Sequence, residues 1–335
     1  MSEAGDFTPA WGDGHDFSSA RRAYDVHAGR SYDDAKAKGK DLKDVVPTSI
    51  TTAARAALVI VADQTGSMAD WPAVMFSKLP YLDHEAREEY LGTDVEFSFA
   101  AIGDARSTGT NKEDYPLQIR PFSKGADMKS ELEALIMEKK GGGTKQETYE
   151  LAALYYARNA SLPNAVNPII IFIGDESPYD MITKADAKQY ARIDIESNIT
   201  TKRVFDELKQ KFAVYLVKKP YDGMSGDRMS ATDQGIFDDW AALIGADHIA
   251  ILPSADRVVD VIFGILAKEA GRVGYFKDEI AGRQRPEQVL TVMKSLKTVL
   301  ALPGPKKGGA VVDPGKSRLA GRKGKDDSDE LDALA

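Results

Sequence analysis

A carboxylate and two hydroxyls alternate in the stretch VADQTGSM, at Asp63, Thr65 and Ser67. These residues come directly after an apolar run that begins at Ala56. All three side chains offer hard oxygen ligands, which suit Mg²⁺. Ser and Thr are equally common at the start of a helix, where a hydroxyl accepts a bond from an exposed backbone N–H. The motif alone therefore leaves a metal site and a helix cap as equal alternatives.

Two later loops add further oxygen ligands. The loop GGGT ends at Thr144, immediately before an expected helix, and the loop GDESPYD places Asp175 after the most apolar segment of the chain. Together the three loops supply two carboxylates and three hydroxyls, a set that favours a divalent cation over three unrelated helix caps. In the second loop, Thr148 and Glu147 remain alternatives to Thr144 as the oxygen ligand.

The pattern of apolar segments predicts a framework that brings these loops together. Strand-length apolar runs alternate with helix-length amphipathic segments, which indicates a doubly wound, mainly parallel α/β sheet with helices on both faces. Residues 117–122 follow the second run without a clear helix, so they predict one antiparallel edge strand. Ligands bind at the carboxyl ends of the strands in such sheets, where Asp63 and Asp175 are expected. The other strands are expected at 57–62, 95–102, 168–174, 212–217 and 248–252, and helices at 75–91, 128–139, 147–160, 202–211, 235–245, 256–270 and 287–302.

The order and placement of these motifs resemble the metal-ion-dependent adhesion site of von Willebrand factor type A domains. The family's first motif is Asp-x-Ser-x-Ser, and here the Thr65 hydroxyl stands in for the first Ser as an equivalent oxygen donor. The resemblance covers roughly residues 55–270 and implies a Rossmann-like sheet of about six strands. It also implies that Mg²⁺, with Mn²⁺ or Ca²⁺ as alternatives, is held directly or through water by Asp63, Thr65, Ser67, Thr144 and Asp175.

The same resemblance implies a function in protein binding. In this family a partner protein often supplies an Asp or Glu that completes the metal shell, so we expect a metal-dependent protein–protein interaction module. Intracellular relatives commonly work with MoxR-type AAA+ ATPases in assembling or remodelling complexes, which implies an adaptor role. Because the sequence contains no recognisable nucleophile–base pair, oxyanion device or cofactor loop, we expect no enzymatic activity.

Two other functions remain open. Phosphatases of the haloacid-dehalogenase-like class also place an Asp after the first strand, and GDESPYD superficially fits their later loop. Those enzymes need a second Asp two residues after the nucleophile, whereas position 65 is Thr, and an alcohol cannot act as a general acid near neutral pH. The second alternative is a structural component of a larger particle.

Net charge and residue composition indicate which classes of partner and which cellular compartment to expect. The formal charge of −8 disfavours general binding to nucleic acid or anionic membranes, because both need a basic surface. The absence of Cys excludes disulfides and thiolate ligands, and no apolar run approaches the length of a membrane span, so we expect a cytoplasmic protein. The expected domains are an N-terminal arm at 1–49, a type A domain at 50–271, a C-terminal helical extension at 272–302 and a disordered tail at 303–335.

Three smaller expectations concern the surroundings of the site. The polar segment 176–199 begins beside Asp175 and is expected to overhang the metal face and select the partner. Residues 222–233 resemble a calcium loop only in composition and are expected to form an ordinary surface loop. Trp71 follows the first motif, and core packing is favoured for it over a binding rim.

Overall fold

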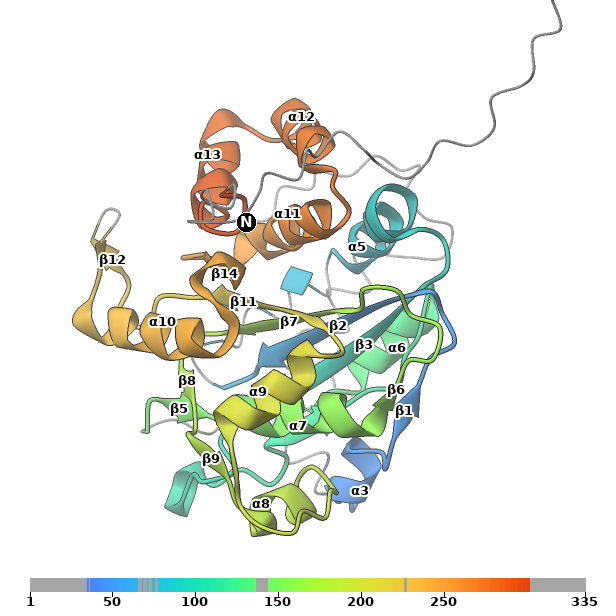
Figure 1. Cartoon of the computed structure of the whole chain (residues 1–335), viewed down its shortest axis with the longest axis vertical. Helices are drawn as coiled ribbons and strands as arrows, with labels where there is room; N and C mark the ends of the chain where they lie inside the picture. Colours follow the sequence, from blue (N-terminus) through green and yellow to red (C-terminus); the bar gives the residue numbers. More distant parts are fainter. Residues whose placement is uncertain are drawn as a thin grey trace, which may run out of the picture. The chain divides into compact units, whose positions relative to one another are not determined.

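The central sheet has six strands in the order β14-β11-β7-β2-β3-β4, and every neighbouring pair is parallel except β3 and β4 (Figure 1). This confirms the predicted mainly parallel sheet with one antiparallel edge strand. The strands are β2 (Ala56–Asp63), β3 (Val95–Ile102), β4 (Leu117–Ile119), β7 (Ile169–Gly174), β11 (Ala213–Lys218) and β14 (Ile249–Ile251). The computed structural model describes residues 35, 37–65, 68, 71, 74–75, 78–136, 144–225 and 228–301.

Strand β2 lies in the interior of the sheet because its sequence, AALVIVAD, is apolar on both faces. All eight of its residues are buried, and it pairs with β3 on one side and β7 on the other. From β2 the chain adds β3 and β4 on one side, then crosses back to add β7, β11 and β14 on the other. The boundary between β2 and β7 is therefore the topological switch point, where open α/β sheets bind their ligands.

Helices cover both faces of the sheet, as predicted. One core layer contains Leu58 and Ile60 of β2, and the other contains Val59 and Val61, because alternate side chains point to opposite faces. The first layer is closed by α5 (Leu79–Glu85), the π-helix η2 (Ala86–Leu91), α6 (Asp127–Glu133), α11 (Val258–Glu269), α12 (Val273–Arg283) and α13 (Pro286–Ser295). The second is closed by α3 (Leu42–Val45), α7 (Tyr149–Asn159), α8 (Lys184–Gln189), α9 (Thr201–Lys209) and α10 (Ala231–Ile244).

The C-terminal helices α12 and α13 pack against α11 and belong to the same core (Figure 1). The sequence predicts a helix at 287–302, and the structure has α13 there, ending at Ser295, together with α12, which the sequence did not predict. The break falls at Arg285, which is extended because a residue before proline avoids the α-helical conformation, and Pro286 then starts α13. Phe276 of α12 and Val292 of α13 are both fully buried.

Short two-stranded pairs connect the loops around the sheet: β1 (Ile50–Thr51) with β6 (Ala160–Ser161), β5 (Gln146–Glu147) with β8 (Ser177–Pro178), β9 (Met181–Ile182) with β10 (Ile199–Thr200), and β12 (Met224–Ser225) with β13 (Arg228–Met229). The part of the chain that the structure describes also contains the 3₁₀ turns η3 (Gly109–Asn111), η4 (Ala246–His248) and η5 (Ala255–Arg257). Residues 222–233 thus contain the β12–β13 pair, which ends at Met229, and the first turn of α10, which carries the buried Asp233. Asp233 pairs with the buried Lys218, so this carboxylate is committed to an ion pair with β11.

Trp71 and the last part of the predicted N-terminal arm are both buried in the core. Trp71 is buried in the core layer beside α11, which confirms the core interpretation. The last part of the predicted arm is also in the core, since Val45 and Val46 are buried in the layer beside α7. The aromatic residues of the arm at positions 7 to 32, and the predicted tail, lie outside the described residues.

Glu85 gives the fold a pH dependence. This residue is buried at the end of α5, and burial, followed by the charge of Glu89, raises the pKa of its carboxyl to about 7. The folded chain then holds a proton that the unfolded chain releases, so stability falls as pH rises from the ordinary Glu range to about 7. We expect Glu85→Gln to raise the free energy of unfolding at about pH 8 by about 1–3 kcal/mol and to change it little at about pH 4.

Urea unfolding of both proteins at the two pH values measures this effect. Glu88→Gln is the matched control, because Glu88 lies in the same helical stretch with an exposed side chain. Its stability is expected to follow that of the unmodified chain at both pH values. An equal gain from Glu85→Gln at low and high pH contradicts the titration and indicates a packing effect instead.

Candidate metal centre

Asp63 is the last residue of β2, and its side chain is fully buried. Its Oδ1 accepts a hydrogen bond of 2.7 Å from the backbone N–H of Thr65, which turns the chain sharply after the strand. Its Oδ2 lies 3.5 Å from the hydroxyl of Tyr149, a residue of the first turn of α7. Thr65 is also buried, whereas Ser67 lies outside the described residues.

Asp175 lies beside this group because of the strand register. In the β2–β7 ladder Ala62 is opposite Ile173, so the chain places Asp63 opposite Gly174 and directly next to Asp175. The Asp175 side chain is 1% exposed, and its Oδ2 forms a 3.1 Å ion pair with Nζ of Lys219. Two carboxylates from adjacent strands therefore meet at the switch point of the sheet, with one lysine ammonium beside them.

The second loop reaches the edge through several residues. Thr144 is exposed, and its hydroxyl donates to the carbonyl of Gln146 at 2.9 Å and lies 3.4 Å from Oδ2 of Asp104. Thr148 is buried, and its hydroxyl donates to the carbonyl of Gly103 at the end of β3. Of the two threonines weighed as ligands, Thr144 thus contacts the end of β3, and Thr148 adjoins Tyr149, which contacts Asp63.

Further acids at this edge enlarge the site beyond the predicted ligands. Asp104 follows β3 by two residues, is fully buried, and accepts hydrogen bonds from the Tyr179 hydroxyl and the Arg106 backbone, both at 2.8 Å. Glu147 and Glu176 are buried as well. Asp104 could have been found by the signal that identified Asp175, an acid just past an apolar strand. Lys219, Tyr149 and Tyr179 carry no such signal.

Several buried acids are concentrated at this edge, where burial and mutual repulsion oppose their ionisation. Burial and the nearby charge of Asp175 raise the pKa of the Asp63 carboxyl well above its usual range. Burial and the charge of Asp63 do the same to the pKa of Glu147. For Glu176, burial and the charge of Asp175 raise the pKa to about 7. Buried carboxylates are costly unless a cation or hydrogen-bond donors compensate them, so the edge favours a bound cation.

The donor set fits a hard divalent cation. Asp63, Asp175 and the hydroxyl of Thr65 are oxygen ligands at one end of two adjacent strands, and Mg²⁺ commonly binds through one or two carboxylates while keeping several waters. Within the described ranges, no three His, Asp or Glu side chains converge closely enough to hold an ion by themselves. A cation here would therefore depend on hydroxyls, water or an outside ligand for the rest of its shell.

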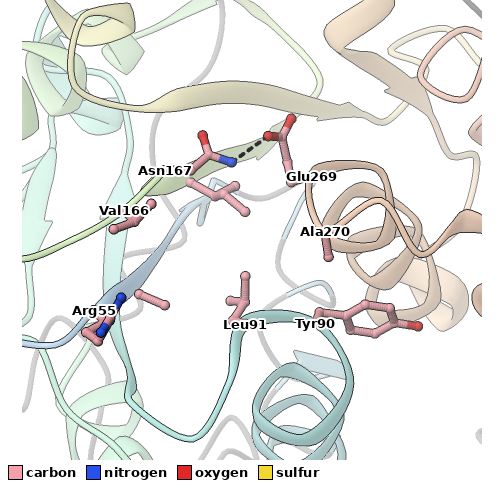
Figure 2. A pocket seen from close by; sticks show the side chains of 9 residues that line it. Arg55, Tyr90, Leu91, Val166, Asn167, Glu269 and Ala270 are labelled. Carbon is pink, nitrogen blue, oxygen red and sulfur yellow. Dashed lines mark hydrogen bonds between the residues drawn. The ribbon is translucent and has the colours of Figure 1, made fainter. Parts of the chain in front are cut away.

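A separate cavity lies at the opposite edge of the sheet. It has a volume of about 300 Å³ and is lined by residues where β2 and β7 begin, including Ala56 and Ile169. Figure 2 shows Asn167 and Glu269 side by side in its lining, joined by a hydrogen bond of 2.7 Å. Glu269 also accepts a hydrogen bond from the Tyr215 hydroxyl. The Glu269 carboxylate thus accepts hydrogen bonds from two donors. The cavity therefore lacks the buried carboxylates without donors that are found at the acidic edge.

The segment 176–199 is more closely integrated than its polarity suggests. It begins at the acidic edge through β8, but it also contributes Ile182, Tyr190 and Ile195 to the core layer beside α7. Arg106 lies over the Tyr179 ring, with its guanidinium carbon 4.2 Å from the ring centre, and pairs with Asp186 at 3.3 Å. The sequence did not predict this contribution to the core, because the apolar residues of the segment are spaced without the period of a helix or a strand. Its role in selecting a partner stays a prediction.

Comparison with known proteins assigns neither a family nor a relative. No family model and no curated protein matches the chain. Similar solved structures include the pilus adhesin SpaC from Lactobacillus rhamnosus GG in its open conformation, at 13% identity and a TM-score of 0.44, covering 70% of this chain and 31% of that one. Proximal thread matrix protein 1 from the mussel byssus matches at 11% identity and a TM-score of 0.40, covering 68% of this chain and 47% of that one. The matched part spans less than half of either structure, and likeness at this level carries no functional assignment.

Within the described part of the chain, each helix is too short or too polar to cross a lipid bilayer.

Proposed function

We propose that the chain is a metal-dependent protein-binding module of the von Willebrand factor type A kind. Asp63, Thr65, Ser67, Thr144 and Asp175 hold Mg²⁺, or Mn²⁺ or Ca²⁺ in its place, directly or through water. The observation that carries the proposal is the position of Asp63 and Asp175, two buried carboxylates on adjacent strands at the topological switch point. Buried charges of this kind need a cation, and these oxygen atoms suit a hard one.

The partner in this proposal is a protein that presents an Asp or Glu to the metal. Two carboxylates only balance the formal charge of a divalent ion, so an anionic oxygen gains most from an open coordination position. An adaptor of this kind works in the cytoplasm during assembly or remodelling of a complex, with a MoxR-type AAA+ ATPase as the class of partner implied by the family resemblance. Nucleic acid and membranes are not proposed as partners, because the net charge is negative.

Metal-dependent capture tests this function. The full chain is immobilised and exposed to an extract of its source cells in Mg²⁺, in EDTA, and in EDTA followed by excess Mn²⁺, with Asp63→Asn as the control bait. We expect proteins that bind in Mg²⁺, leave in EDTA and return with Mn²⁺, and that Asp63→Asn fails to retain. Recovery that ignores both the chelator and the substitution contradicts metal-mediated binding.

The enzyme alternative predicts a different result. A Mg²⁺-dependent phosphatase of the haloacid-dehalogenase-like class turns over a generic phosphoester, and Asp63→Asn removes that turnover. Thr65 disfavours this alternative, because its hydroxyl cannot protonate a leaving group near neutral pH. The remaining alternative is a structural component of a larger particle. Such a protein is expected to turn over no phosphoester and to keep its partner in EDTA.

A further inference from the structure

Glu147 and Glu176 are brought together by the short pairing of β5 with β8. In this parallel pair Gln146 is opposite Ser177 and Glu147 is opposite Pro178, so Glu176 immediately precedes its strand. Glu147 is fully buried and Glu176 is 6% exposed. The strand pairing therefore places these two buried acids at neighbouring positions. The loop before α7 and the loop after β7 thus each contribute one acid to the same buried position.

These two acids differ from the other buried acids of the edge in what they contact. Within the described ranges, no N–H or O–H donor reaches either oxygen of Glu147 or Oε2 of Glu176. By contrast, Asp63 accepts a backbone N–H and Asp104 accepts the hydroxyl of Tyr179. Glu150, which lies in the same helix start as Tyr149, accepts the backbone N–H of Tyr179 at 3.2 Å.

Two lysines lie near this pair of acids. The ammonium of Lys219 forms an ion pair with Asp175. That of Lys145 lies 5.6 Å from the centre of the Tyr221 ring, and its charge acts against the raised pKa of Glu176. Two neighbouring carboxyl groups that are buried and lack donors need either a proton or a cation to compensate them. The neighbouring carboxylate of Asp63 makes the position more anionic, which favours a cation.

We propose that Glu147 and Glu176 hold a second divalent cation beside the one bound by Asp63 and Asp175. This inference rests on the proposed metal-dependent function and extends it to a two-cation centre. The ligand class is a hard ion such as Mg²⁺, Mn²⁺ or Ca²⁺, held by two carboxylates and completed by water. The second ion neutralises acids that otherwise repel one another and fixes the β5–β8 pair next to the first ion.

Counting bound Mn²⁺ tests the proposal. Mn²⁺ is titrated into the full chain, and the free ion is measured by electron paramagnetic resonance. The unmodified chain is expected to bind about two Mn²⁺ ions, and Glu147→Gln about one, because the amide removes one charged ligand and supplies a donor to Glu176. Glu150→Gln is the matched control, since that buried carboxylate has its own backbone donor, and it is expected to keep about two ions.

The outcomes separate this inference from the function on which it rests. One bound ion in the unmodified chain, unchanged in Glu147→Gln, overturns the second position and leaves the Asp63–Asp175 site standing. Loss of all Mn²⁺ in Glu147→Gln also overturns it, because Glu147 is then a ligand of a single shared ion. No Mn²⁺ in the unmodified chain defeats the proposed function itself. Circular dichroism checks that each variant folds, and if Glu147→Gln does not fold, the count in the unmodified chain decides.

Discussion

Asp63→Asn is expected to weaken Mg²⁺ binding by roughly 100-fold or more while leaving the sheet intact. The amide is nearly the same size as the carboxylate, and its oxygen can still accept the 2.7 Å hydrogen bond from the backbone of Thr65. The substitution therefore removes the charge that attracts the cation and keeps the turn. Removing one of two neighbouring carboxylates also relieves repulsion with Asp175, so stability in EDTA is expected to remain equal or to rise.

Isothermal titration calorimetry gives the affinity, and thermal unfolding in EDTA gives the stability. Asp104→Asn is the control, because Asp104 is an equally buried acid at the end of the neighbouring strand and is not a predicted ligand. We expect it to lower Mg²⁺ affinity by less than about 10-fold, the effect of losing a nearby charge without losing a ligand. If Asp63→Asn binds Mg²⁺ as tightly as the unmodified chain, the assignment of the centre is wrong.

Gly174→Ala is expected to destabilise the fold by about 2–3 kcal/mol and to disturb the metal site. A Cβ at this position would lie 1.7 Å from the hydroxyl oxygen of Tyr149, far inside van der Waals contact. Tyr149 cannot easily move, because it is fully buried and packs edge-on against Trp240, with ring centres 5.1 Å apart. Any shift of the ring also moves the hydroxyl away from Asp63.

A double-mutant cycle with Tyr149→Phe tests the cause of this loss. Removing the hydroxyl takes away the closest contact of the new methyl group and leaves a ring carbon at 2.7 Å, so Gly174→Ala is expected to cost less in the Tyr149→Phe background, with a coupling of about 1–2 kcal/mol. Gly235→Ala serves as the matched control, because this exposed glycine of α10 has open space around it. It is expected to stabilise the chain by about 0.5–1 kcal/mol. Strictly additive costs at Gly174 and Tyr149 contradict the steric explanation.

The sheet was predictable because its strands are apolar on both faces. AALVIVAD, VEFSFAAI and IIIFIG read as buried strands separated by helical segments, and this order fixes a parallel sheet with helices on both faces. The antiparallel edge strand was predictable from the absence of a helix before Leu117. The positions of Asp63 and Asp175 at one edge followed from the same order, because carboxyl ends of parallel strands lie together.

The side chains that complete the acidic edge could not be predicted in the same way. Lys219 and Tyr149 approach Asp175 and Asp63 only through the strand register and the packing of α7, neither of which is visible in a local pattern. The segment 176–199 was judged by its charge, yet its scattered apolar residues are buried. Replacing the whole segment would therefore damage the core, and its role in partner choice is better tested at exposed positions such as Met181.

The central position of β2 in the sheet also determines when the acidic edge forms during folding. Its pairing with β3 joins segments close together in the chain, whereas its pairing with β7 closes a much longer loop, which costs more conformational entropy. During synthesis, a chain that has emerged only as far as β4 already carries Asp63 but lacks Asp175, Glu176 and Lys219 altogether. The full set of acids thus comes together only after β7 has paired with β2. A cation that needs acids from both halves therefore binds only a chain in which this pairing has formed.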